Sequence, residues 1–323
     1  MSFKPIIIVC GEPNSVFSEL LAKSLKKYKS KKPIIIIGSF DLINLQLKRL
    51  RLNINLHKIN LREKLIENIK FNKINIIDIN YEFKKVFEPI SSKSNKYISK
   101  CFEMAFNIIK SNKISGFING PVSKKFFLKD KYPGITEYIA DKFKIKNHYA
   151  MLIFNNDLSV CPITTHLPLN KVSNKINKKD IINKSLIINN FYKIYFSIKP
   201  KIAITGLNPH CENFFNKSEE KKVIEPAIKS LKKKQIKIFG PYPADTIFLK
   251  QNSKKFNVII GMYHDQVLTP IKALHGFNAI NITLGLPFLR ISPDHGPNNK
   301  MVGKNKSDPQ SLINAIKFLN RNL

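Results

Sequence analysis

Short runs of β-branched residues alternate with longer helical patterns along this chain of 323 residues. Runs with the length of a buried strand include 5–10 (PIIIVC), 201–207 (KIAITGL) and 257–262 (NVIIGM), and the clearest helical pattern covers 94–112. Strands that helices cover on both faces read as continuous apolar runs. The alternation therefore predicts an α/β fold with mainly parallel sheets.

The same patterns place the remaining elements. Further strands are expected at 33–37, 74–79, 149–154, 158–164 and 279–284, and further helices at 16–28, 41–50, 180–196, 218–234 and 307–322. Either Ser39 or Asp41 can serve as the N-cap of the second of these helices, because both side chains can accept a hydrogen bond from the first turn.

The formal net charge of +33 is the most unusual bulk property of the chain. Clustered lysines neutralise phosphates, so the charge alone suggests a polyanionic partner. The lysines are scattered over almost every expected helix and loop, however, and the longest run is 232–234 (KKK). No stripe of interleaved basic and aromatic residues appears. We therefore expect no nucleic-acid partner, with a basic nucleic-acid binder as the competing hypothesis.

Cysteine usage and hydropathy indicate the compartment. Cys10, Cys101, Cys161 and Cys211 form no CxxC pair, which fits free thiols in a reducing compartment. The first apolar run is too short for a signal peptide, and no stretch approaches the roughly 18 to 20 apolar residues that span a bilayer. We expect a cytoplasmic protein without membrane contact.

Three of the seven histidines, His166, His210 and His264, come shortly after apolar strand runs. Ligands of an open parallel sheet bind at the carboxyl ends of its strands, because the loops converge there. Three protein ligands with an open fourth position are typical of a catalytic metal site. A single histidine after a strand is more often a capping or packing residue, so only the shared position of the three favours a metal.

Two further groups have polar side chains suited to a site. Asp245 lies in 240–246 (GPYPADT), which is equally well explained as a plain turn. Lys272, Asn281 and Arg290 follow His264 and suit an anionic substrate, although a lone basic residue in so basic a chain is usually solvated surface. The GxGxxG, GxxxxGK[ST] and GxSxG motifs are absent from the chain.

Longer motifs occur in a fixed order along the chain: 164–169 (TTHLPL), 206–210 (GLNPH), 240–246 (GPYPADT), 262–266 (MYHDQ), and 281–288 (NITLGLPF) followed by 294–296 (DHG). Together they resemble the 4-hydroxythreonine-4-phosphate dehydrogenase family of vitamin B6 synthesis, over nearly the whole chain. The resemblance implies two α/β/α domains like those of isocitrate and isopropylmalate dehydrogenases, with the active site in the cleft between them. The expected domains are 1–130 plus 285–323 on the cofactor side, and 131–284 with the metal site and the dimerisation surface.

The resemblance also implies roles for individual residues. The metal ligands would be His166, His210 and His264; the substrate contacts Thr136, Lys272, Asn281 and Arg290; the candidate catalytic groups Asp245 and Lys272; and the cofactor contacts His295, Gly296 and Gly303. The implied cofactors are a divalent metal (zinc, alternatively magnesium or cobalt) and NAD or NADP. The implied assembly is a homodimer with the active site at the subunit interface.

The activity implied by the resemblance is oxidation of 4-phosphooxy-L-threonine by NAD to 2-amino-3-oxo-4-phosphooxybutanoate. This product then decarboxylates to 3-amino-2-oxopropyl phosphate, in the synthesis of pyridoxine 5′-phosphate. A metal held by three neutral imidazoles keeps its positive charge and can favour the alkoxide from which hydride leaves. The same ion can stabilise the enolate that decarboxylation forms.

The chain departs from the family pattern at several positions. Ile135 occupies the place of a histidine that contacts substrate, the loops 11–17 and 211–214 are altered, and Lys300 and Asn305 replace an acidic residue and a glycine in the cofactor stretch. Isoleucine cannot donate a hydrogen bond, so one phosphate contact should be missing. Two alternatives therefore stay open: a related dehydrogenase for another phosphorylated hydroxy acid, and a folded relic that has lost activity.

Overall fold

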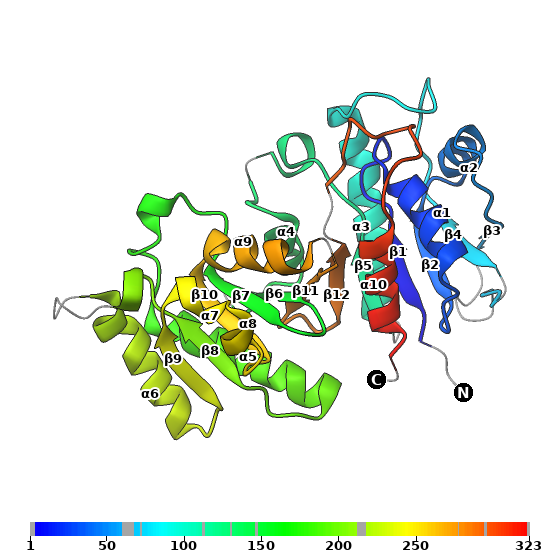
Figure 1. Cartoon of the computed structure of the whole chain (residues 1–323). Coiled ribbons are helices and arrows are strands. Elements are labelled where there is room, and N and C mark those ends of the chain that lie inside the picture. Colours follow the sequence, from blue (N-terminus) through cyan, green and yellow to red (C-terminus); the bar gives the residue numbers. More distant parts are fainter. Residues whose placement is uncertain are drawn as a thin grey trace. The chain divides into compact units, whose positions relative to one another are not determined.

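The protein is an α/β chain of two compact units, each built on a mainly parallel sheet (Figure 1). The first unit comprises residues 1–138 with 288–322, and the second comprises 139–287 with residue 323. The computed structural model describes residues 4–59, 68–71, 73–111, 114–129, 131–145, 148–211, 218–276, 278–293 and 296–321. Among them, no helix has the length and apolar character needed to cross a membrane.

The sheet of the first unit has the strand order β3-β4-β2-β1-β5-β12, and all of these neighbours pair in parallel. Its strands are β1 (Ile6–Val9), β2 (Ile34–Gly38), β3 (Leu56–Lys58), β4 (Ile74–Asp78), β5 (Gly116–Asn119) and β12 (Arg290–Pro293). Its described helices are α1 (Phe17–Lys27), α2 (Phe40–Arg49), α3 (Asn95–Ser111) with the preceding turn η1 (Ser92–Ser94), the π-helical turn η2 (Lys124–Leu128), α10 (Gln310–Leu319) and the beginning of α4 (Ile135–Lys142).

The first unit shows why its sequence runs form these elements. Every residue of β1 is buried, as expected for a central strand that helices cover on both faces. The two N-cap candidates of α2 are resolved in favour of Ser39, whose hydroxyl accepts a hydrogen bond from the backbone N–H of Leu42. Asp41 lies instead in the first helical turn, where its charge favours the helix dipole.

The sheet of the second unit has the order β11-β6-β7-β10-β8-β9. Its strands are β6 (Ala150–Phe154), β7 (Ser159–Thr164), β8 (Ile202–Thr205), β9 (Ile238–Tyr242), β10 (Val258–Tyr263) and β11 (Ile280–Leu284). Its described helices include α5 (Lys178–Phe196), α6 (Glu225–Lys233) with the π-helical turn η5 (Glu220–Ile224), α7 (Ala244–Ile247), α8 (Lys250–Ser253) and α9 (His264–His275). The strands from β7 to β9 pair in parallel, whereas β6 is antiparallel to both of its neighbours.

Helix α9 is an element that the sequence-based reading did not predict, because Pro270 lies inside it. The helix packs on β7 and β10 (Figure 1). Its side chains Val267 and Ile271 are buried in one cluster with Val160 and Ile259 from those strands. Full burial of each such side chain stabilises the fold by about 1.5–3 kcal/mol. This packing fixes the helix whose first residue is His264.

Candidate metal centre and substrate site

The three histidines singled out in the sequence follow three neighbouring parallel strands of the second unit. β10 lies between β7 and β8 and pairs in parallel with both. His166 follows the end of β7 by two residues, His264 directly follows β10, and His210 comes after β8. All three residues therefore stand at the carboxyl edge of this sheet.

His166 and His264 form a close imidazole pair. Their ring centroids are 5.9 Å apart and their planes are inclined by 36°. Two imidazoles on one tetrahedral ion have centroids about 5 Å apart, since each nitrogen lies about 2.0–2.1 Å from the metal. At 5.9 Å the spacing of this pair is close to that value and slightly wider.

Asp265 fixes the orientation of one ring of this pair. Its Oδ1 lies 2.6 Å from Nδ1 of His264, and the histidine side chain is 37% exposed. A neutral imidazole that donates its Nδ1 proton to a carboxylate keeps the Nε2 lone pair for a metal. The Asp265–His264 contact resembles the support that metal-binding histidines commonly have.

His210 shares the edge with this pair without completing a site. Within the described ranges, no three His, Cys, Asp or Glu side chains lie close enough together to hold one metal ion. Residues 212–217, which follow Cys211, lie outside the described part of the chain. The three-histidine site is accordingly a prediction, supported here by a shared sheet edge and by one imidazole pair.

Two of the three histidines have strained backbones. The φ angles of His166 and His210 are 53° and 56°, and that of Cys211 is 56°. Left-handed conformations of residues other than glycine cost about 1–3 kcal/mol each, and they persist only where the surroundings impose them. The contacts that hold the two loops are therefore part of the candidate site.

Glu220 holds the loop that carries His210. Its buried carboxylate accepts hydrogen bonds from the backbone N–H groups of Leu207 (2.8 Å) and Asn208 (2.9 Å), and from Nδ2 of Asn208 (2.9 Å). Burial alone would raise the pKa of Glu220, but the hydrogen bonds from Asn208 and Leu207 outweigh it and lower this pKa. Glu220 was not among the candidate residues that the sequence indicated.

Gln266 connects the ends of β10 and β8, the strands that precede His264 and His210. Its buried Oε1 accepts hydrogen bonds from the backbone N–H of Met262 (2.6 Å) and from the hydroxyl of Thr205 (2.8 Å). Its Nε2 donates to the carbonyl oxygen of Gly206 at 2.8 Å. These bonds fix the start of α9 against the end of β8. Sequence reasoning missed this role, although Gln266 belongs to the motif 262–266.

The other predicted residues of the second unit lie at several places. Asp245 is exposed on α7, directly after β9, and its charge helps to raise the pKa of Cys211, although burial of the thiol is the larger cause. Asp245 thus stands near the loop of His210. Lys272 is exposed on α9. Asn281 lies on β11, and its buried Oδ1 has no hydrogen-bond partner among the described residues, so a ligand N–H or O–H could satisfy it.

Arg290 and Thr136 contact each other directly in the first unit. Arg290 is fully buried, and it donates from Nη1 to Oγ1 of Thr136 (2.9 Å) and from Nε to Oδ1 of Asn119 (2.8 Å). Burial lowers the pKa of Arg290 to about 9, while the charge of Glu137 opposes the shift. Asn119 was missed from the sequence; its one signal is its position at the carboxyl end of β5.

The predicted cofactor stretch lies beside the amino-terminal loop of the same unit. The carbonyl oxygen of Pro297 accepts a hydrogen bond from the N–H of Val16 at 3.2 Å. Gly303 has a φ of 75°, and a Cβ there would lie 3.3 Å from the ring of Phe87. Gly296 is exposed, and His295 lies outside the described residues. The stretch is thus placed next to the altered loop 11–17.

Comparison with known proteins gives one consistent family. A family model described as "Pyridoxal phosphate biosynthetic protein PdxA" matches residues 29–319. The chain is 37% identical to a 4-hydroxythreonine-4-phosphate dehydrogenase of Sulfurihydrogenibium sp., covering 97% of this chain and 96% of that protein. It is 34% identical to the protein of the same name from Aquifex aeolicus, over 98% and 97% of the two chains. It is also 29% identical to a D-threonate 4-phosphate dehydrogenase of Salmonella typhimurium, over 98% of each.

Solved structures give the same result. A 4-hydroxythreonine-4-phosphate dehydrogenase from Klebsiella pneumoniae matches with a TM-score of 0.84 and 26% identity, over 98% of both chains. An isocitrate dehydrogenase from Methylococcus capsulatus matches with a TM-score of 0.50 and 8% identity, over 96% of this chain and 83% of that one. The second likeness concerns the fold alone, and it confirms the predicted isocitrate dehydrogenase-like fold class.

Replacement of Glu220 by glutamine tests whether its carboxylate stabilises the loop that precedes His210. A carboxyl whose pKa is lowered by folding stabilises the fold above its ordinary pKa of about 4.3, and this contribution is lost as the pH falls through the lowered value. We expect Glu220→Gln to reduce the free energy of unfolding by about 1–3 kcal/mol at pH 7. The difference from the wild type should shrink as the pH falls below about 4.

Urea denaturation at a series of pH values measures this difference. Asp157→Asn is the matched control, since it neutralises an exposed carboxylate of the same unit and should change stability by no more than about 0.5 kcal/mol. Equal stability of Glu220→Gln and the wild type at pH 7 would contradict the assignment, as would a difference that does not depend on pH.

Proposed function

This chain belongs to the pyridoxal phosphate biosynthetic protein PdxA family, and on that premise we propose that it oxidises 4-phosphooxy-L-threonine with NAD or NADP. The product, 2-amino-3-oxo-4-phosphooxybutanoate, would lose carbon dioxide to give 3-amino-2-oxopropyl phosphate for pyridoxine 5′-phosphate synthesis. The observation that carries the proposal is the imidazole pair of His166 and His264, at the sheet edge that also bears His210.

The residues at this edge suit a divalent metal. Imidazole nitrogen is a preferred ligand of zinc and also binds cobalt, whereas magnesium prefers oxygen ligands. The ion would lower the pKa of the substrate hydroxyl and so favour hydride transfer. In this proposal His166, His210 and His264 hold the ion, and Asp265 keeps Nε2 of His264 available for it.

The remaining site residues would bind the substrate and move its proton. We propose that Asn281 offers its buried Oδ1 to a substrate donor, and that Lys272 and Arg290 offset the charges of phosphate and carboxylate. Thr136 and Asn119 hold the Arg290 side chain through their hydrogen bonds to it. Asp245 and Lys272 are the candidates for the proton acceptor.

Replacement of one histidine of the pair tests whether NADH formation depends on the metal. We expect NADH formation from 4-phosphooxy-L-threonine to cease in His264→Ala and to cease on chelation of the wild type. Asp265→Asn should weaken metal binding by about 10–100-fold, because supporting partners of ligand histidines typically have effects of that size. Absorbance at the NADH band, together with metal content after equilibrium dialysis, checks both expectations.

His275→Ala is the matched control, because His275 is the last residue of the same helix α9. This variant should keep its metal and its activity. A chelated enzyme that still forms NADH at the full rate would contradict the proposal.

A homodimer with the active site at the subunit interface is part of the proposal. Large apolar side chains are exposed in the second unit: Leu167 (40% exposed) and Leu169 (68%) follow His166, and Leu274 (51%) lies near the end of α9. Exposed apolar groups of this kind are typical of surfaces that bind another protein. The proposed partner is a second copy of this chain.

Sedimentation of a Leu169→Lys variant tests the dimer. A buried, unpaired ammonium is costly, so the substitution should shift the protein toward monomer. Ile194→Lys is the matched control, because Ile194 is 72% exposed on α5 and its substitution should leave the dimer intact. A Leu169→Lys protein that sediments as the wild type does would contradict an interface at this edge.

A second candidate function is oxidation of another phosphorylated hydroxy acid, such as D-threonate 4-phosphate. Ile135 favours it, because this half-buried first residue of α4 offers no hydrogen bond where the family has a histidine. The ratio of kcat/KM for the two substrates discriminates between the candidates. A ratio in favour of D-threonate 4-phosphate would replace the first proposal by the second.

Ile135→His should restore the missing contact to the substrate phosphate. A hydrogen bond to a charged group contributes about 1.5–3 kcal/mol, so KM for the preferred substrate should fall by roughly tenfold or more. Ile135→Phe, which changes bulk without adding a donor, is the control and should bring no such gain. An unchanged KM in Ile135→His would show that this position does not face the phosphate.

A further inference from the structure

A pocket of about 420 Å³ opens in the first unit, and none of its lining residues belongs to the proposed dehydrogenase site. One wall is the segment that follows β4, and the other is the turn η1 with the first half of α3. The lining residues are Asn80, Tyr81, Glu82, Lys93, Lys96, Tyr97 and Lys100. The pocket therefore lies at the carboxyl end of β4 in a parallel sheet, where α/β proteins commonly bind ligands.

The charge of this pocket suits an anion. Lys93, Lys96 and Lys100 are spaced by three and four residues, so they share one face of the helical segment. The pocket lining contains one carboxylate, that of Glu82, beside these three ammonium groups. Two further carboxylates lie close to the lining: Glu88 interacts with Lys93, and Glu12 accepts a hydrogen bond from the hydroxyl of Ser94. Bound phosphate would offset the excess positive charge of the lining itself.

The opposite wall supplies polar groups at fixed positions. The hydroxyl oxygen of Tyr81 accepts a hydrogen bond from Nδ2 of Asn14 at 3.2 Å, so its own proton can be donated to a ligand. Asn80 adds an amide to this wall. Lysine ammonium groups opposite neutral donors are a common arrangement around phosphate.

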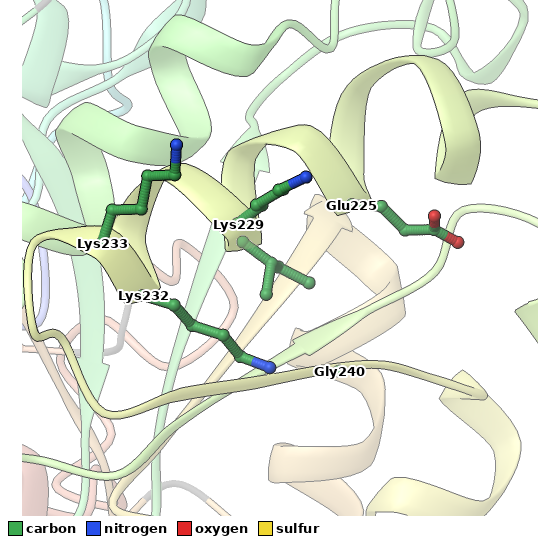
Figure 2. A pocket seen from close by; sticks show the side chains of 6 residues that line it. Glu225, Lys229, Lys232, Lys233 and Gly240 are labelled. Carbon is green, nitrogen blue, oxygen red and sulfur yellow. The ribbon is translucent and has the colours of Figure 1, made fainter.

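A second group of three lysines lines a groove whose other side offers no polar side chain among its described lining residues. A groove of about 630 Å³ in the second unit is lined by Glu225, Ile228, Lys229, Lys232, Lys233 and Gly240. Figure 2 shows Lys229, Lys232 and Lys233 pointing in different directions from α6. Only Gly240 lies across from the helix, and it carries no side chain. This groove has the same number of ammonium groups without an opposing polar wall.

We propose that the pocket between residues 80–82 and 93–100 binds the phosphate group of a small phosphorylated molecule. The site is distinct from the histidine edge and from Arg290. A phosphate of the dinucleotide and the phosphate of a separate metabolite share the required chemistry.

Isothermal titration of the full-length protein with inorganic phosphate at low ionic strength tests the proposal. The wild type should show a saturable site for phosphate in addition to any binding at Lys272 and Arg290, the residues proposed to bind the substrate. Lys96→Gln/Lys100→Gln should weaken that site by about tenfold or more, since it removes two charged donors. The control Lys229→Gln/Lys232→Gln removes the same charge from the groove of Figure 2 and should leave the affinity unchanged. Circular dichroism establishes that both variants are folded.

An equal loss of affinity in both double variants would overturn the proposal, because binding would then follow net charge alone. Undiminished binding by Lys96→Gln/Lys100→Gln, or no saturable binding by the wild type, would overturn it as well. Competition then distinguishes the two sources. Displacement of phosphate by NAD or NADP identifies the dinucleotide, and saturable binding that persists beside the dinucleotide identifies a separate metabolite. The titration needs neither metal nor turnover, so its failure is independent of any failure of the dehydrogenase assay.

Discussion

Parallel pairing of β7, β10, β8 and β9 is the constraint on which the candidate site depends. Parallel neighbours end at the same edge of a sheet, so the loops that follow these four strands all lie along one edge. The residues delivered are His166, His264, His210 and Asp245. Slippage of one strand by a single residue would move each of its side chains to the opposite face of the sheet, so the apolar core of the second unit also sets the positions of these polar groups.

Hydrogen bonds from buried polar side chains fix the loops that follow the strands at this edge. Gln266 joins the ends of β10 and β8, and Glu220 holds Leu207 and Asn208 ahead of His210. Such hydrogen bonds offset the cost of left-handed backbone at a histidine. The same principle operates in the first unit, where Asn119 and Thr136 hold the buried guanidinium of Arg290. Positioning by distant polar partners is thus a shared feature of both units.

The sequence predicted the apolar strands and the histidines that follow them, because periodicity and order along the chain are local signals. The antiparallel placement of β6 was not predicted; its four-residue connection to β7 is short enough for a hairpin and too short for a parallel crossover. Helix α9 was obscured by Pro270, and β9 by a glycine and a proline inside it. Gln266 was missed for another reason: one of its partners, Gly206, lies 60 residues away in the chain.

X-ray absorption spectroscopy of the metal-loaded protein is the most direct test of the central claim. A single ion bound by three imidazoles should give nitrogen scatterers at about 2.0–2.1 Å together with the outer-shell scattering of imidazole rings. The His210→Ala variant should lose one such ligand or the ion itself. A wild-type spectrum with sulfur in the first coordination shell at about 2.3 Å, or with oxygen ligands and no imidazole rings, would contradict the account.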